Sequence, residues 1–179
     1  MKSKITTLLF LCTILLSCSK DSDLFIEDSP TADRIIVIDG QTTQDPVILS
    51  QTDLMAGQNI LMGFVTVGLD ENGLLEVTYN SDGDWEIEET HLFIGELSDL
   101  PTNNGGNPKI GQFPYKANHP AGTNTVTYEI GTTLAEGACV YVAAHAVVTD
   151  TSNGQTETAW GAGVPIGGNS WAMMFEVCN

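Results

Sequence analysis

The chain has 179 residues, 42% of them hydrophobic and 7% aromatic, which is enough for one domain with a substantial core. Its 18 glycines and 7 prolines favour many short elements joined by turns, and this composition excludes a disordered or collagen-like chain. Six Lys and Arg against 23 Asp and Glu give a net charge of -17. Such a charge repels phosphate backbones, so nucleic acid is excluded as a partner.

Residues 1–17 have the features of a secretory signal peptide. Two lysines precede an apolar run over residues 8–16, which is too short to span a membrane, and a small residue, Ser17, stands before Cys18. The segment 15–18 resembles the lipobox of bacterial lipoproteins, which implies that the leader is removed and that the thiol of Cys18 carries lipid. The alternative is an ordinary cleaved signal that is followed by an unmodified cysteine.

Residues 18–33 are polar and acidic, and they predict a tether between the lipid and the domain. The stretch 19–23, which combines Ser, Lys and Asp, is similar to the sequence that follows the lipidated cysteine in surface lipoproteins of Bacteroidota. This resemblance implies attachment to the outer membrane, with the protein facing the cell exterior. The β-branched stretch 34–38 is interpreted either as a first strand or as part of the tether.

From residue 60 onward, short stretches with strand-like composition alternate with turns rich in Gly, Asn and Pro. An Asn-Gly pair at positions 72 and 73 predicts a tight hairpin turn, and a long loop follows residue 95. The pattern predicts an all-β domain over residues 34–179, an antiparallel β-sandwich of the Ig-like or jelly-roll kind. The predicted strands cover residues 60–69, 74–79, 85–95, 125–130, 139–148, 157–160 and 171–177.

Four cysteines are present, and their positions predict one disulfide. Cys12 is lost with the leader and Cys18 is consumed by lipid, so Cys139 and Cys178 remain as a pair in an oxidising compartment. Closing a loop of roughly 40 residues stabilises a domain by about 4 kcal/mol in the chain-entropy model. Two free buried thiols are the alternative. Loss of two lysines with the leader also lowers the net charge of the mature protein to about -19.

Several motifs resemble a β domain that recurs in secreted bacterial and archaeal proteins. They include Glu-Thr-His-Leu at residues 89–92, Ala-Ala-His-Ala-Val-Val at 143–148 and Glu-Thr-Ala-Trp-Gly at 157–161. The resemblance runs from about residue 54 to the C-terminus. It implies an extracellular β domain and carries no catalytic assignment.

Two histidines lie within apolar strand segments. Alternation places Glu89 and His91 on one face of the strand 85–95, together with Trp85, Ile87 and Phe93. If that strand neighbours the segment 139–148, then Glu89, His91, His145 and Glu157 meet in one buried polar cluster. Residues of these types ligate zinc and other transition metals, whereas the alternative is a structural network that satisfies its own hydrogen bonds.

A second group of oxygen-bearing side chains, Asn80, Asp82 and Asp84, surrounds the predicted turn before residue 85. Calcium prefers such oxygens, although the spacing does not match an EF-hand loop. A solvated acidic turn is the alternative interpretation.

Four aromatic residues, Tyr115, Trp85, Trp160 and Trp171, are candidates for a surface on which sugar rings stack. The alternative is that these side chains fill the core, as aromatics in strands usually do.

The sequence therefore favours a non-catalytic, lipid-anchored surface module that presents its long Asn/Gly/Pro-rich loop to a glycan or a protein partner. No cofactor is required by this interpretation. The alternative is a metal-dependent hydrolase built on the His/Glu cluster, although the chain contains no Gly-x-Ser-x-Gly, phosphate loop or Cys-x-x-Cys motif.

Overall fold

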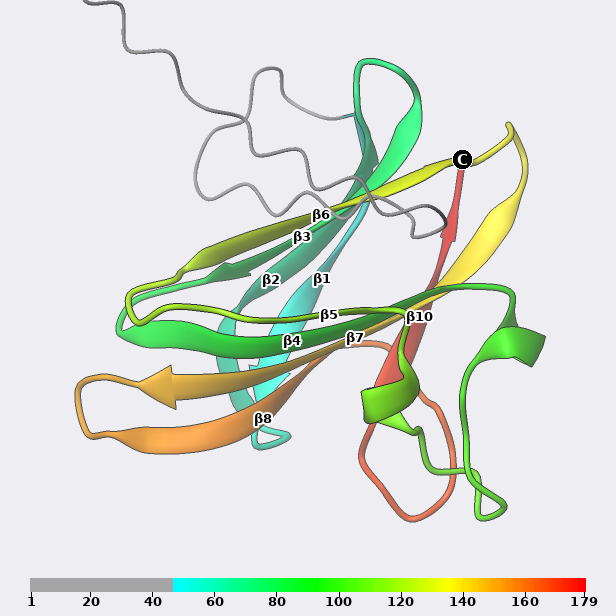
Figure 1. Cartoon of the computed structure of the whole chain (residues 1–179). Helices are drawn as coiled ribbons and strands as arrows, with labels where there is room; N and C mark the ends of the chain where they lie inside the picture. Colours follow the sequence, from blue (N-terminus) through cyan, green and yellow to red (C-terminus); the bar gives the residue numbers. More distant parts are fainter. Residues whose placement is uncertain (1–46) are drawn as a thin grey trace, which may run out of the picture. The chain divides into compact units, whose positions relative to one another are not determined.

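The computed structural model describes residues 47–179, so the predicted signal peptide, the tether and the stretch 34–38 lie outside the described residues. The described chain forms ten strands and two short 3-10 turns (Figure 1). Between residues 47 and 179, no helix is long and apolar enough to cross a membrane. The elements are β1 (Val47–Ala56), β2 (Ile60–Leu69), β3 (Leu74–Ser81), β4 (Trp85–Gly95), η1 (Leu97–Asp99), η2 (Ile110–Gln112), β5 (Tyr115–Asn118), β6 (Thr125–Thr133), β7 (Cys139–Asp150), β8 (Gln155–Gly161), β9 (Val164–Pro165) and β10 (Met173–Cys178).

The prediction of an all-β antiparallel sandwich is confirmed, and its two layers belong to one continuous sheet. The strand order is β5-β4-β7-β8-β1-β2-β3-β6, and β10 pairs with β7 beside this path. The sheet folds over at β8 and β1, so that β6, β3, β2 and β1 form one layer and β4, β7 and β8 the other (Figure 1). Its two ends come close together, because the rings of Tyr115 on β5 and Tyr128 on β6 are 6.2 Å apart.

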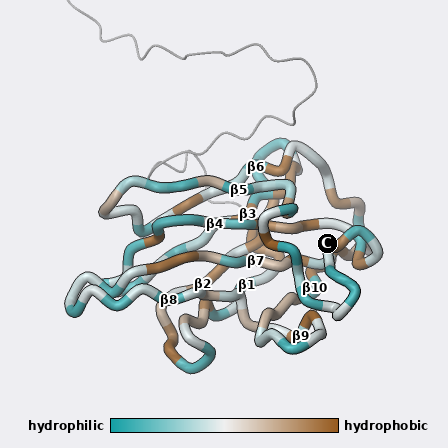
Figure 2. The backbone as a smooth tube through the Cα atoms, turned by 60° about the horizontal axis from the view of Figure 1, so that its bottom comes forward, coloured by the Kyte–Doolittle hydropathy of each residue, from teal (hydrophilic) through white to brown (hydrophobic). Residues whose placement is uncertain are grey.

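Alternation along each strand fills the space between the layers. Hydrophobic and hydrophilic stretches follow one another along the backbone in Figure 2. The hydrophobic side chains that face inward form the main core. Its fully buried members include Leu54, Val65, Val77, Ile87, Leu92, Val126, Val142 and Val148. Hydrogen bonds between the layers add to this packing, since the hydroxyl of Tyr79 on β3 donates to the carbonyl oxygen of His91 on β4 at 3.2 Å.

The predicted hairpin turn between β2 and β3 is confirmed, and side-chain chemistry explains it. The Asp70 carboxylate accepts hydrogen bonds from the backbone N–H groups of Asn72 and Leu74, both at 2.8 Å. Gly73 has a φ of 75°, a value that glycine adopts without steric cost. The turn therefore fixes the register in which Leu69 opposes Leu75.

The predicted disulfide between Cys139 and Cys178 is present. The two residues oppose one another at one end of the β7–β10 pair, and both are exposed. The bridge closes 39 residues of sequence and ties the last strand to the centre of the sheet.

Three strands were not predicted. β1 carries Ser, Gln, Thr and Asp between its apolar residues, β5 has four residues inside a loop flanked by prolines, and β9 has two. All three take their strand conformation from their neighbours, because β1 pairs with β2 along nearly its whole length, β5 pairs with β4, and β9 pairs with β10.

Candidate functional site

The outer face of the layer β4, β7 and β8 has two different halves. One half is covered by the segments around η1, η2 and β9, which pack a second hydrophobic cluster against it. This second cluster contains Phe93, Leu100, Phe113, Ala143, Trp160, Ala172 and Met174. The other half, which we call the bare half, lies toward the β3–β4 and β7–β8 turns and carries Glu86, Glu88, Glu89, Val147, Thr149, Thr156 and Thr158.

A β-bulge in β4 determines which side chains reach the bare half. Ile87 opposes Val148, whereas Glu89 opposes the next residue, Val147, so Glu88 is the extra residue. The shift reverses which face of the sheet each residue of β4 before the bulge points to. Simple alternation predicted Ile87 on the face of His91, and this prediction is wrong, because Ile87 lies fully buried in the main core.

The two histidines meet at the boundary between the halves. His91 and His145 are direct cross-strand partners with ring centroids 5.4 Å apart, and the ring of Trp160 lies 4.8 Å from that of His145. His145 is 2% exposed and His91 is 7% exposed. The Nε2 atom of His91 lies 3.3 Å from Oε1 of Glu89, and the Nδ1 atoms of both histidines are buried without a hydrogen-bond partner.

Burial keeps this histidine pair neutral. Desolvation, reinforced by the neighbouring His91, lowers the pKa of His145 from 6.5 to about 4. Desolvation also lowers the pKa of His91, with a smaller contribution from Lys116, while Glu89 acts in the opposite direction. Both imidazoles are therefore uncharged at neutral pH.

The predicted cluster of four residues is only partly assembled. Glu89, His91 and His145 come together, but the prediction that Glu157 joins them is wrong. His145 opposes Trp160 and Val148 opposes Glu157, and this spacing places Glu157 on the other face of the sheet. There, a carboxylate oxygen of Glu157 accepts a hydrogen bond from Nε2 of Gln155 at 2.7 Å. Within residues 47–179, no group of three or more His, Cys, Asp or Glu side chains is arranged to hold a metal ion.

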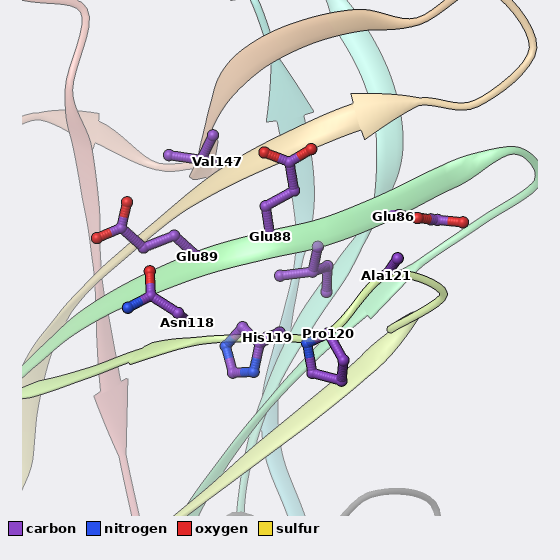
Figure 3. Close-up of a pocket in the computed structure, with 9 residues that line it drawn as sticks. Glu86, Glu88, Glu89, Asn118, His119, Pro120, Ala121 and Val147 are labelled. Atoms are coloured by element: carbon purple, nitrogen blue, oxygen red, sulfur yellow. The ribbon is translucent and has the colours of Figure 1, made fainter.

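A surface cavity of about 400 Å³ lies across the bulge (Figure 3). Nine residues line it: Glu86, Ile87, Glu88, Glu89, Asn118, His119, Pro120, Ala121 and Val147. Residues 118–121 belong to the long loop singled out in the sequence, and its path beside β4 is held by a hydrogen bond from the His119 N–H to the carbonyl oxygen of Glu88 at 2.8 Å. The Glu88 side chain is held by the hydroxyl of Thr149, which donates to Oε1 at 2.6 Å.

A buried hydroxyl on β4 connects this loop to the inside of the domain. Thr90 Oγ1 lies 2.8 Å from Nε2 of His119 and 2.5 Å from the hydroxyl oxygen of Tyr128 on β6. Sequence reasoning did not single out Thr90 or Tyr128. The signal for them is weak, because a threonine and a tyrosine in strands are common and only the fold shows that they meet.

The three residues proposed for calcium do not converge. Asn80 lies within β3 and accepts a hydrogen bond from the hydroxyl of Thr125 at 3.2 Å. Asp82 and Asp84 are exposed in the β3–β4 turn, where the carbonyl oxygen of Asp84 accepts hydrogen bonds from the N–H and hydroxyl of Thr151. This arrangement matches the alternative interpretation, a solvated acidic turn.

The four aromatic residues do not form one platform, so that prediction is wrong. Tyr115 is 8% exposed in the main core, and Trp85 packs against the same core. Trp160 is 5% exposed in the second cluster, and Trp171 packs against that cluster. This cluster lies on the outer face of the sheet, away from the main core. These aromatic side chains therefore pack in or against the two hydrophobic clusters.

Comparison with known proteins gave no family model, no curated protein and no solved structure that matches this chain.

Proposed function

We propose that this chain is a non-catalytic, lipid-anchored surface module that binds a glycan or a protein partner in the cavity across β4. The observation that supports the proposal is the cavity itself, which combines three carboxylates, an amide and apolar walls at a bulge in an uncovered part of the sheet. Bulges redirect side chains and are frequent beside functional sites. Its volume lies within the range of natural ligand sites, which is about 300–1,000 Å³.

The state of the histidines supports binding rather than catalysis. A general base must come within hydrogen-bond reach of a substrate proton. The Nδ1 atoms of His91 and His145 are buried, and Nε2 of His91 lies 3.3 Å from Oε1 of Glu89. The buried pair is therefore suited to supporting the cavity wall through Glu89.

The proposed location rests on the lipobox-like segment before Cys18 and on the acidic stretch that follows it. The exposed disulfide agrees with an oxidising compartment, because such bonds persist mainly in exported proteins. We infer attachment to the outer membrane through lipid on Cys18, with the domain facing the cell exterior.

A matched pair of bulky substitutions tests the binding site. Val147→Trp places an indole at the cavity, whereas Val164→Trp adds the same group at a site on β9 that is 56% exposed. The full-length protein in detergent is tested against a glycan array and an array of cell-surface proteins. The proposal predicts a saturable interaction that Val147→Trp abolishes and Val164→Trp leaves intact. Equal binding by all three proteins, or chemical turnover of the bound molecule, contradicts it.

A further inference from the structure

The bare half carries a concentration of acidic side chains. Between residues 47 and 179, sixteen acidic residues stand against two lysines, and five of the acidic residues fall within 82–89. Neither lysine lines the cavity. The ammonium group of Lys116 donates instead to the carbonyl oxygen of Gly111 at 2.9 Å.

Two of these carboxylates lie against neighbouring side chains. The hydroxyl of Thr149 positions Glu88. Oε1 of Glu89 lies 3.3 Å from Nε2 of His91, whose pKa is lowered by burial. Contacts that order these side chains favour binding of an oppositely charged group, because less ordering remains to be done on binding.

The histidine pair lies beside Glu89 without lining the cavity. His91 and His145 are more than nine-tenths buried on the same face, and their Nδ1 atoms have no partner. An unpaired buried nitrogen destabilises the folded state. The two unpaired nitrogens therefore lower the stability of the fold at the boundary of the bare half, beside Glu89.

We propose that the bare half docks a basic segment of a partner protein, with Lys or Arg side chains entering the cavity beside Glu86, Glu88 and Glu89. This inference rests on the proposed function and names its partner. Charge complementarity selects a cationic partner. A protein is favoured over a glycan because no Phe, Tyr or Trp side chain lines the cavity, whereas Trp160 and Tyr115 are buried in the two cores.

Two triple variants with the same change of net charge test this inference. Glu86→Gln, Glu88→Gln and Glu89→Gln together remove three negative charges from the bare half. Each glutamine keeps a side-chain oxygen, including the one that accepts from Thr149. Glu71→Gln, Glu96→Gln and Glu136→Gln remove three exposed charges at other turns. Glu96, the residue after the end of β4, is seven residues from Glu89, roughly 23 Å at the strand rise, which is beyond the screening length of about 8 Å at physiological salt.

The probe is a lysine-rich peptide, and its lysine-acetylated form is the control. Binding to the full-length protein in detergent is measured at 0.15 M salt, where the first triple variant is expected to bind at least about tenfold more weakly and the second within about twofold of wild type. The acetylated peptide is expected not to bind.

Equal weakening in both triple variants means attraction by net charge alone and overturns the inference. Absence of peptide binding to wild type also overturns it. If an amino-sugar oligomer or a neutral glycan then binds and Val147→Trp abolishes that binding, the proposed function stands and only the basic-protein assignment fails. If no ligand of any class is lost in Val147→Trp, the proposed function fails as well.

Discussion

The buried histidine pair predicts a specific loss of stability in acid. In the unfolded chain His145 takes up a proton near pH 6.5, whereas in the folded protein it does so only at about pH 4. Between these values the unfolded state binds more protons, so the free energy of unfolding falls as pH falls through this window. A shift of about 2.5 pKa units at 1.36 kcal/mol each corresponds to about 3 kcal/mol, all of it present above pH 6.5.

The perturbation that isolates this effect is His145→Phe, which keeps an aromatic ring against Trp160 and His91 but removes the titrating nitrogens. Urea unfolding at a series of pH values from 7.5 to 4 is the assay. At pH 7.5 we expect the variant to lie within about 1 kcal/mol of wild type, because a partnerless nitrogen is removed while a slightly larger ring is accommodated.

Between pH 6.5 and pH 4, wild type is expected to lose about 3 kcal/mol more than His145→Phe does. His145→Ala serves as a second comparison, because it also removes the titrating group but leaves a cavity, and it is expected to be less stable than wild type at every pH above 6.5. Parallel pH profiles for wild type and His145→Phe refute the reasoning, since they mean that His145 titrates alike in the folded and unfolded states.

Three further outcomes follow from other parts of the chain. Replacing Cys139 and Cys178 together by Ser is expected to lower the free energy of unfolding by about 4 kcal/mol, measured by urea unfolding, and an unchanged midpoint contradicts a stabilising bridge. Thr90→Val leaves the buried hydroxyl of its tyrosine partner unpaired and is expected to cost about 1–3 kcal/mol in thermal melts, whereas the same change at the exposed Thr156 costs at most about 0.5 kcal/mol. Cys18→Ala is expected to move the protein out of the membrane fraction and to abolish labelling by fatty acid, and retention of either property contradicts lipid attachment.

Strand positions with strong local signals were predictable from sequence. The segment 60–69 and the segment 85–95 coincide with β2 and β4, because β-branched and aromatic residues alternate there between turns marked by Gly, Asn and Asp. β1 was missed for a physical reason, since its polar residues carry little intrinsic preference and its pairing with β2 decides its conformation.

The candidate site was only partly predictable. His91 lies close to His145 only if β4 and β7 are neighbouring strands. The sequence alone does not establish that pairing, and the fold confirms it. The predicted alternation of faces along β4 is wrong before the bulge, because one extra residue there places the preceding residues of the strand on the opposite face. Glu157 was misplaced because the register of β8 on β7 is set by long-range packing that no local pattern contains.

The second hydrophobic cluster was not foreseen at all. It forms when the long loop after β4 and the segment before β10 fold back over the outer face, so that Phe113 packs between Phe93 and Trp160. This packing explains why aromatic residues that resembled a sugar platform are buried. It also leaves the other half of the same face uncovered, which is where the cavity lies.

Binding in the cavity across β4 is the central claim, and mapping of a bound ligand by NMR tests it most directly. Backbone amide signals of the full-length protein in detergent are recorded while the lysine-rich peptide is added at 0.15 M salt. Saturable shifts are predicted for residues 86–89, for Asn118, His119 and Ala121, and for Val147, with little change in the loop 103–107. Shifts confined to that loop or to the outer face of the β1, β2, β3 and β6 layer contradict the claim.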